Sequence, residues 1–122
     1  MAIFMQCFSS APYYWSAAGI LVGQGKYDEA LPYFTESMET YRRTLGDEHL
    51  DTLTSINNMG SLLKSQGKYD EALPYFSEAL ETRRRTLGDE HPDTLASINN
   101  IGDLLTKQGK YDEALPYMQE SI

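Results

Sequence analysis

The side chains best suited to catalysis or metal binding in this sequence are two histidines. His49 and His91 each follow the stretch GDE, 42 residues apart. A helical zinc site of the H-E-x-x-H type needs a second histidine four positions away, and neither residue has one. Asp47, Glu48 and Asp51 could surround a cation together with His49, but a charged, solvated turn explains these acids more simply. The sequence therefore predicts no metal site.

Patterns for nucleophilic or phosphoryl-transfer chemistry are missing as well. The sequence has no G-x-S-x-G stretch and no glycine-rich phosphate loop. Cys7, the only cysteine, has no neighbouring pattern that would pair it with His49 as an activated nucleophile. We therefore expect neither enzymatic activity nor a cofactor. A remote alternative is that these residues are the regulatory part of a larger enzyme, which the natural open reading frame would test.

Both histidines belong to a repeat with a period of 42 residues. The stretch QGKYDEALPYF begins at Gln24 and again at Gln66, and it starts a third time at Gln108, where Met118 replaces the phenylalanine. Residues 24–65 and 66–107 align without a gap and differ at only ten positions. A fixed period of this size is typical of solenoids, in which each unit buries its apolar face against its neighbours. The sequence thus predicts an extended surface rather than an active-site pocket.

The stretch DTLTSINNMGSLLKS, at residues 51–65, is predicted to form an amphipathic helix. At 100° per residue, its apolar side chains and one glycine fall within one half of the helical wheel, and its polar side chains fall within the other. The first set is expected to be packed and comprises Leu53, Ile56, Met59, Gly60, Leu62 and Leu63. The second set is expected to face outward and comprises Thr54, Asn57, Asn58, Ser61, Lys64 and Ser65.

A second amphipathic helix is predicted over residues 69–87. Pro74 lies close to its start, where a missing N–H costs least because the first donors have no partner within the helix. Gly88 provides a C-terminal stop, and the acids and Pro92 of DEHPD suit the start of the next helix. Each unit is therefore expected to be helix, short turn, helix and longer loop. The apolar stripe of this second helix comprises Tyr69, Ala72, Leu73, Phe76, Ala79, Leu80 and Leu87.

These patterns resemble a known repeat family. Gly102-x-x-Leu105 in the first helix and Ala72-x-x-x-Phe76 in the second are similar to the tetratricopeptide repeat, which usually spans about 34 residues. The 42-residue form, with LGDEHPDTLASINNIGDLLTKQGKYDEALPY at 87–117, resembles the repeats of kinesin light chains and nephrocystin-3-like proteins. The resemblance covers residues 24–122. It implies an all-α, right-handed superhelical solenoid of antiparallel helix pairs. Because the heptad segment that joins a kinesin light chain to its motor is absent, we do not identify the chain as a kinesin subunit.

The resemblance also implies that the first helices line a concave groove that binds peptide segments of partner proteins. In that family the paired asparagines contact the peptide, and here they are Asn57, Asn58, Asn99 and Asn100. An amide side chain both donates and accepts, so it can pair with a peptide backbone whatever the peptide sequence. Asn57 and Asn99 lie centrally on the polar face, whereas Asn58 and Asn100 lie at its edge, where they could serve helix packing instead. The further candidates on this face are Ser61, Lys64, Asp103 and Thr106.

Simpler explanations of the asparagines stay open. Asparagine is common on a solvated helix face, and duplication of a whole unit would repeat both pairs. Four of the ten differences between the units fall on the same polar face, which suits constant gripping groups among variable neighbours, although drift at exposed sites predicts much the same. The expected function is a non-enzymatic scaffold that binds a peptide of a partner protein in the groove. The alternative is an architectural or self-assembling array without a dedicated ligand.

Composition restricts the partners and the location. Eighteen Asp and Glu against ten Lys and Arg give a net charge of −8, which repels nucleic acid. The densest basic group, Arg83 to Arg85, is expected to offset the negative pole at the end of its helix. The longest apolar run, at 17–23, is far shorter than the roughly 20 residues of a membrane span. A single cysteine allows no internal disulfide, so we expect a cytoplasmic protein with no membrane partner.

The first unit departs from the repeat. Residues 10–23 align with the first helix, and Trp15 and Ser16 replace its asparagines. Pro12, Gly19 and Val22 replace polar groups, so this face becomes apolar. Three interpretations of this first unit stay open. It is a divergent unit whose apolar face packs against another surface, its Trp15 is an aromatic anchor for a ligand, or it marks a boundary beyond which the natural protein continues upstream. The packed stripe expected to survive here comprises Ala11, Tyr14, Ala17, Ala18, Ile20 and Leu21.

The expected organisation is three helix pairs after a short N-terminal segment. Residues 1–9 form that segment, for which disorder is one expectation. The pairs occupy residues 10–45, 46–87 and 88–122, and the last pair is truncated in its second helix. Because open apolar ends need a partner, we expect either a fragment of a longer array or self-association through the ends.

Overall fold

The computed structural model describes the backbone of residues 11–120 and the side chains of residues 17–120. These residues form six α-helices and no strand. The expected N-terminal segment at 1–9 lies outside the described residues, as do the last two residues of the expected third helix pair. In chain order the helices are α2 (Ala11–Gly23), α3 (Tyr27–Leu45), α4 (Leu50–Ser65), α5 (Tyr69–Leu87), α6 (Pro92–Lys107) and α7 (Tyr111–Glu120).

The helix boundaries follow the sequence pattern. α5 occupies the residues predicted for the second helix, and α4 begins one residue before the predicted first helix. Gly88 ends α5 as expected, with a φ of 91° that glycine adopts without strain. The explanation offered for Pro74 was wrong, because it lies inside α5, five residues after Tyr69. The helix continues through this exposed proline although the carbonyl of Asp70 loses its intrahelical donor.

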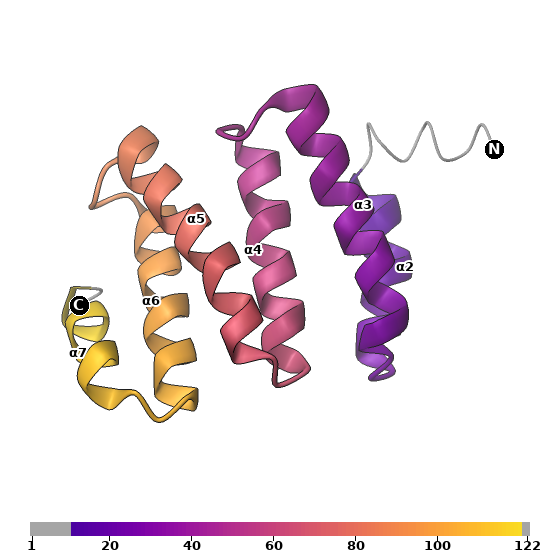
Figure 1. Cartoon of the computed structure of the whole chain (residues 1–122). Helices are drawn as coiled ribbons and strands as arrows, with labels where there is room; N and C mark the ends of the chain where they lie inside the picture. The colour runs from indigo at the N-terminus through magenta and orange to yellow at the C-terminus, as the bar shows by residue number, and fades with distance from the viewer. Residues whose placement is uncertain (1–10, 121–122) are drawn as a thin grey trace.

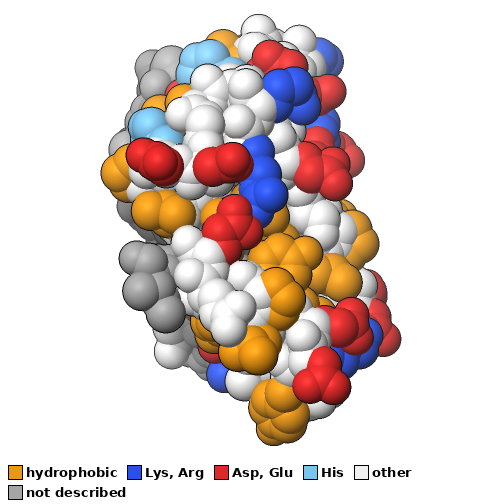
Figure 2. Space-filling model, turned by 90° about the vertical axis from the view of Figure 1, so that its left-hand side faces the viewer, with side chains coloured by type: hydrophobic (Ala, Val, Ile, Leu, Met, Phe, Trp, Pro, Cys, Tyr) orange, Lys and Arg blue, Asp and Glu red, His pale blue; other side chains and the backbone are white. Residues whose placement is uncertain are grey.

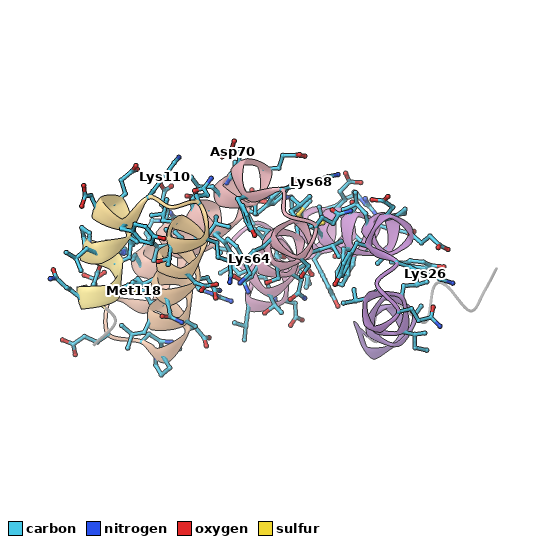
Figure 3. All side chains as sticks on the ribbon, turned by 90° about the horizontal axis from the view of Figure 1, so that it is seen from below. Lys26, Lys64, Lys68, Asp70, Lys110 and Met118 are labelled. Carbon is cyan, nitrogen blue, oxygen red and sulfur yellow. The ribbon has the colours of Figure 1, made fainter. Side chains whose placement is uncertain are left out.

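The helices form antiparallel pairs that stack along one direction, and each helix packs against its neighbours in sequence (Figure 1). Viewed along the helices, α2, α4 and α6 lie in one layer and α3, α5 and α7 in the other (Figure 3). In Figure 1, α3 lies in front of α2 whereas α7 lies beside α6, so successive pairs are rotated relative to one another. The stack is the solenoid of helix pairs that the repeat period predicted.

The short turn between the helices of a pair is closed by the QGK stretch. Gly67 has a φ of 78°, and its N–H donates to the carbonyl of Lys64 at 2.9 Å. The N–H of Lys68 donates to the carbonyl of Leu63 at 2.9 Å, which completes a Schellman motif. Glycine recurs in the repeat here because the left-handed residue of this motif carries no steric cost without a Cβ. The same two bonds close the turns at Gly25 and Gly109.

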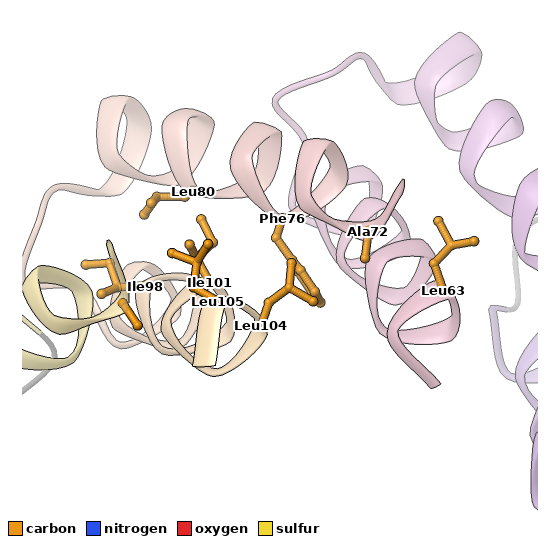
Figure 4. Close-up of a cluster of buried hydrophobic side chains, with 9 residues drawn as sticks. Leu63, Ala72, Phe76, Leu80, Ile98, Ile101, Leu104 and Leu105 are labelled. Atoms are coloured by element: carbon orange, nitrogen blue, oxygen red, sulfur yellow. The ribbon is translucent and has the colours of Figure 1, made fainter. Parts of the chain in front are cut away.

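The core lies between the two layers, in two clusters of buried side chains, and Figure 4 shows the larger of them. Phe76 of α5 is 1% exposed and lies in the larger cluster, between the residues that α4 and α6 contribute. Burying a side chain of this size stabilises the fold by about 1.5–3 kcal/mol. The packed face predicted for α4 is buried throughout: Leu53, Ile56, Met59, Gly60, Leu62 and Leu63.

Two members of the predicted packed stripes are exposed, and those predictions were wrong. Leu87, in the last turn of α5, is 38% exposed, and Ile20 of α2 is 62% exposed. The equivalents of Ile20 in the next two units, Leu62 and Leu104, are only 4% and 0% exposed. The difference arises because those leucines are covered by the preceding helix pair. Ala11 and Tyr14 were also predicted to be packed, but their side chains lie outside the described residues.

The constant 42-residue spacing also produces a series of polar contacts between successive helix pairs, which we call the ladder of inter-pair contacts. Gln66 Nε2 donates to Asp28 Oδ1 at 2.6 Å, and Gln108 repeats this bond with Asp70. Arg42 binds both carboxylate oxygens of Glu78, at 2.7 and 2.8 Å. The same contact joins the next pairs through Arg84 and Glu120. Much of the QGKYDEALPYF stretch therefore recurs because each copy closes the same turn, contributes to the same core and forms the same hydrogen bond to the neighbouring helix pair.

Candidate functional site

The predicted binding residues lie on the side of α4 and α6 that faces away from the second-helix layer. We call this surface, together with the adjoining part of α2, the first-helix face. Figure 3 looks along the helices onto its edge, with Lys64 near the centre. The face is assembled from three parallel first helices, so its shape depends on how side chains meet between them.

The paired asparagines have different surroundings. Asn100 Nδ2 donates to Asn57 Oδ1 at 3.0 Å, so these two amides bridge α6 and α4. Asn57 keeps its NH₂ group and Asn100 its carbonyl oxygen for another partner. Asn99 is exposed on α6, and Asn58 is half-buried on α4, towards α2. Of the four amides, Asn99 is thus the most accessible, and the Asn57–Asn100 bond also has a structural role.

The charged candidates are joined to each other. Lys64 Nζ lies 3.0 Å from Asp103 Oδ2, and this ion pair bridges α4 and α6 beside the asparagine bond. The opposite charges of these two candidates therefore neutralise each other within the face. Thr106 donates its hydroxyl to the carbonyl of Gly102 at 2.8 Å, within its own helix, which leaves the oxygen able to accept.

A small cavity opens on the first-helix face between α2 and α4. Its volume is about 140 Å³. Asn58 and Ser61 line it from α4, whereas Val22 of α2 and Phe34 of α3 contribute apolar walls. Leu62 and Ser65 complete the lining. A cavity of similar volume with an apolar lining can hold a benzene-sized group, so one apolar side chain of a ligand would fit here.

The repeat explains why the cavity lies at this junction. Adding 42 to the numbers of Val22 and Ser61 gives Lys64 and Asp103, the two members of the ion pair. A long lysine stem and a carboxylate thus occupy, between α4 and α6, the positions that Val22 and Ser61 hold between α2 and α4. Three of the six lining positions differ between the two junctions, because Ser65 also corresponds to Lys107, and the differences at Val22 and Ser61 supply the ion pair that bridges the second junction.

Sequence reasoning identified Asn58 and Ser61 but missed the four other lining residues as binding candidates: Val22, Phe34, Leu62 and Ser65, of which Ser65 was expected to face outward. A signal for Val22 was present, because it replaces a polar group of the repeat on the outward side of its helix. Phe34 and Leu62 carried no such signal, since both belong to packed stripes and reach the cavity only where the helices separate. Trp15, the possible aromatic anchor, has its side chain outside the described residues.

Larger, open clefts lie at the turns between the helices of a pair. One of about 650 Å³ is lined by residues that include Lys26, Asp28 and Lys68. Its equivalent one unit later, of about 480 Å³, includes Asp70 and Lys110. Figure 3 labels Lys26, Lys68 and Lys110 at the three equivalent turns. Because lysines and carboxylates alternate there, and Gln66 and Gln108 already bind Asp28 and Asp70, these clefts follow from the repeat and favour no ligand charge.

The histidines have a structural role that the sequence did not reveal. His49 Nδ1 accepts a hydrogen bond from the N–H of Asp51 at 3.0 Å, and His91 does the same for Asp93. Each histidine is therefore the N-cap of a first helix, a role usually filled by Ser, Thr, Asp or Asn. Among the residues that the structure describes, no group of three or more His, Cys, Asp and Glu could hold a metal ion.

The three consecutive arginines bind different groups. Arg85 binds Glu48 and Arg84 binds Glu120, on the surface. Arg83 is only 7% exposed, and its Nη1 donates to Ser97 Oγ at 2.7 Å. Burial lowers the pKa of Arg83, and the nearby Asp93 opposes that shift. The cluster was expected only to offset a helix pole, but it connects α5 to three different segments.

Comparison with known proteins agrees with this geometry. Residues 9–82 and 55–122 match the model of the tetratricopeptide repeat. A kinesin-light-chain-type protein of Podosopora anserina with nearly identical repeats superposes with a TM-score of 0.85 at 22% identity, over 94% of this chain and 55% of that one. BtubC (BKLC) from P. vanneervenii gives 0.79 at 24% identity, over 88% of this chain and 42% of that one.

The tetratricopeptide domain of Arabidopsis FLU gives a TM-score of 0.73 at 21% identity, over 89% of this chain and 88% of that one. No curated protein matches the chain. The chain spans about half the length of the Podosopora and P. vanneervenii structures. Within residues 11–120, no helix is long and apolar enough to cross a bilayer. Together, the 42-residue period, the stacked helix pairs and the match over both overlapping ranges place the chain in the tetratricopeptide-repeat family, whose members are generally protein-interaction modules.

Proposed function

We propose that this chain binds an extended peptide segment of another protein on its first-helix face. The observation that carries the proposal is the cavity between α2 and α4, whose lining includes Asn58 and Ser61. A bound peptide would place one aliphatic or small aromatic side chain in this cavity. Asn58 and Ser61 would hydrogen-bond the peptide backbone beside it, and Asn99 and the free NH₂ group of Asn57 would continue the contacts along the face.

The energetics favour one anchoring side chain over many weak contacts. Burying each methylene contributes about 0.8 kcal/mol, so a side chain of three or four carbons contributes about 2–3 kcal/mol. The polar contacts mainly fix the orientation of the peptide, because each replaces a bond to water. At the next junction the Lys64–Asp103 ion pair leaves only polar contacts for the peptide. The expected ligand is therefore a segment with one apolar anchor and a polar continuation.

The repeat itself supplies the variant that tests this proposal. Val22→Lys with Ser61→Asp places at the α2–α4 junction the two side chains that form the ion pair at the α4–α6 junction, so a new ion pair should close the cavity. Lys64→Val with Asp103→Ser is the reciprocal control, since it removes an ion pair elsewhere on the same face. Circular dichroism should first establish that both double variants are as helical as the parent.

Displayed peptides should then be selected against the parent and both double variants. The proposal expects peptides that share an apolar residue at a fixed position, and a loss of about tenfold to a hundredfold in affinity when the cavity is closed. The reciprocal variant should retain these peptides. Asn99→Ala should weaken binding several-fold if the peptide continues along α6. Peptides that ignore closure of the cavity would contradict the assigned site. A selection that enriches nothing would favour the architectural array, which the ladder of inter-pair contacts supports.

A further inference from the structure

The α7 end of the solenoid exposes apolar side chains that are covered elsewhere in the same repeat. Leu115 is 55% exposed and Tyr111 is 67% exposed. Their equivalents one unit earlier, Leu73 and Tyr69, are half-buried and pack at the margin of the larger core cluster. What covers them is α6, the first helix of the following pair. Figure 2 looks onto the α7 end and shows hydrophobic side chains gathered there among acidic groups.

The α2 end has the complementary property. Ile20 is 62% exposed, whereas its equivalents Leu62 and Leu104 are buried against the preceding helix pair. Leu104 lies in one cluster with Leu63, Ala72 and Phe76 of that preceding pair. The α2 end thus exposes Ile20, whose equivalents are covered by the preceding helix pair. The α7 end exposes Tyr111 and Leu115, whose equivalents are covered by the following helix pair.

A polar contact at the edge of the same interface is also divided between the two ends. Inside the chain, Gln66 binds Asp28 and Gln108 binds Asp70, each at 2.6 Å. The next members of the series are Gln24, after α2, and Asp112, in the first turn of α7. Both are exposed. A second copy stacked in the register of the repeat would bring its Gln24 to the Asp112 of the first.

We propose that copies of this 122-residue chain associate head to tail, with the α2 end of one copy against the α6–α7 end of the next. The contact reproduces the internal stacking of one helix pair on another, so Ile20 packs beside Leu115 and Tyr111. Such a contact is heterologous, because it joins two different surfaces, and it leaves an unused end on every assembly. Association should therefore continue beyond the dimer as concentration rises.

The contact should be weaker than the internal junctions. The Lys64–Asp103 ion pair has no equivalent there, since Thr106 and Gly19 hold the corresponding positions. Reversible association that depends on concentration is the expected behaviour, rather than one fixed oligomer.

Sedimentation equilibrium of the full chain, with a reductant so that Cys7 cannot cross-link, tests the proposal. The weight-average mass of the parent should rise from the 13.8 kDa of one chain to at least twice that value with increasing concentration. Ile20→Glu and Leu115→Glu should each remain near the mass of one chain, because each variant loses one of the two surfaces. Mixed in equal amounts, they should form a heterodimer that grows no further, since each supplies the intact surface that the other lacks.

Leu50→Glu is the matched control. Leu50 is 54% exposed, like Leu115, but lies at the start of α4, away from both ends, so this variant should associate as the parent does. A parent that stays monomeric at the highest concentration would overturn the proposal. So would either end variant alone forming dimers, or a mixture that stays monomeric while the parent associates, because both results exclude a head-to-tail contact. Circular dichroism of each variant separates loss of association from loss of fold.

Discussion

Gly60 of α4 lies directly against the ring of Phe76 of α5: a Cβ atom at Gly60 would be 2.9 Å from Cε1 of that ring. The next unit keeps the glycine, as Gly102, but places Met118 opposite it. In the first unit Ala18 occupies the glycine position, and Phe34 is only half-buried. In the α4–α5 pair, the absence of a Cβ at Gly60 thus lets the Phe76 ring pack directly against this position of α4.

Gly60→Ala should lower the free energy of unfolding by about 1–2 kcal/mol. Overpacking typically costs about 1–3 kcal/mol, and alanine returns up to about 1 kcal/mol of helix propensity. Gly102→Ala is the matched control, because the new Cβ would meet the flexible side chain of Met118, whose sulfur would lie 3.0 Å away. That variant should be neutral or slightly more stable. Urea denaturation followed by circular dichroism measures both, and equal effects at the two sites would contradict the packing argument.

Removing the His91 cap should destabilise the chain by about 1 kcal/mol. His91→Ala leaves the N–H of Asp93 without its side-chain acceptor, whereas His91→Asn supplies another acceptor of the kind preferred at this position. The alanine variant should therefore melt at a lower temperature and the asparagine variant close to the parent. Thermal denaturation tests the difference. Equal losses in both variants would show that the imidazole contributes by something other than capping.

Ser97→Ala should lower the free energy of unfolding by more than the loss of one hydroxyl group suggests. It removes the closer acceptor of Arg83 Nη1, at 2.7 Å, and leaves only the carbonyl of Asp93 at 3.4 Å. A buried polar group that loses its partner costs about 1–3 kcal/mol. Arg83→Met should change stability by less than about 1 kcal/mol, because replacing a buried charge by an apolar side chain of similar volume is often neutral. In the double variant most of the loss caused by Ser97→Ala should disappear. A double variant as unstable as the sum of both changes would refute this account.

Glu78→Gln should weaken the fold modestly and in a salt-dependent way. Glu78 accepts two bonds from Arg42 and raises the pKa of that guanidinium. Because both side chains are about one-third exposed, at 30% and 37%, the pair should contribute no more than about 1 kcal/mol. The difference between variant and parent in urea denaturation should shrink towards zero at about 1 M salt, where charges are screened within about 3 Å. A difference that is independent of salt would point to lost packing instead.

Amphipathic spacing and the glycines at the turns predicted where helices begin and end. α5 occupies the expected residues, and every expected core residue of α4 is buried, because amphipathic spacing and glycine turns act within a few residues along the chain. Buried polar side chains escaped this reasoning. Thr52 and Ser97 are fully buried at 0% exposed, and the hydrophobic pattern could not find them, since it counts only apolar residues.

The candidate site was predicted only in part. The polar face of the first helices came from spacing, and the structure describes every residue named for it. Which of these residues are available to a ligand did not follow, because an exposed position on one helix can be covered by the next. Asn99 is open and Asn58 faces a cavity, whereas Asn57 shares a hydrogen bond with Asn100.

The sequence by itself determined the period, the helix pairs and the turns, because these depend on local spacing and on glycines that accept a left-handed backbone. Only the tertiary structure decided which side chains meet between repeats. Asn57 meets Asn100, 43 residues away, and Lys64 meets Asp103, 39 residues away, so neither pairing follows the 42-residue register. These offsets are set by how each helix pair is shifted and rotated on the one before it, and a one-dimensional repeat does not contain that geometry.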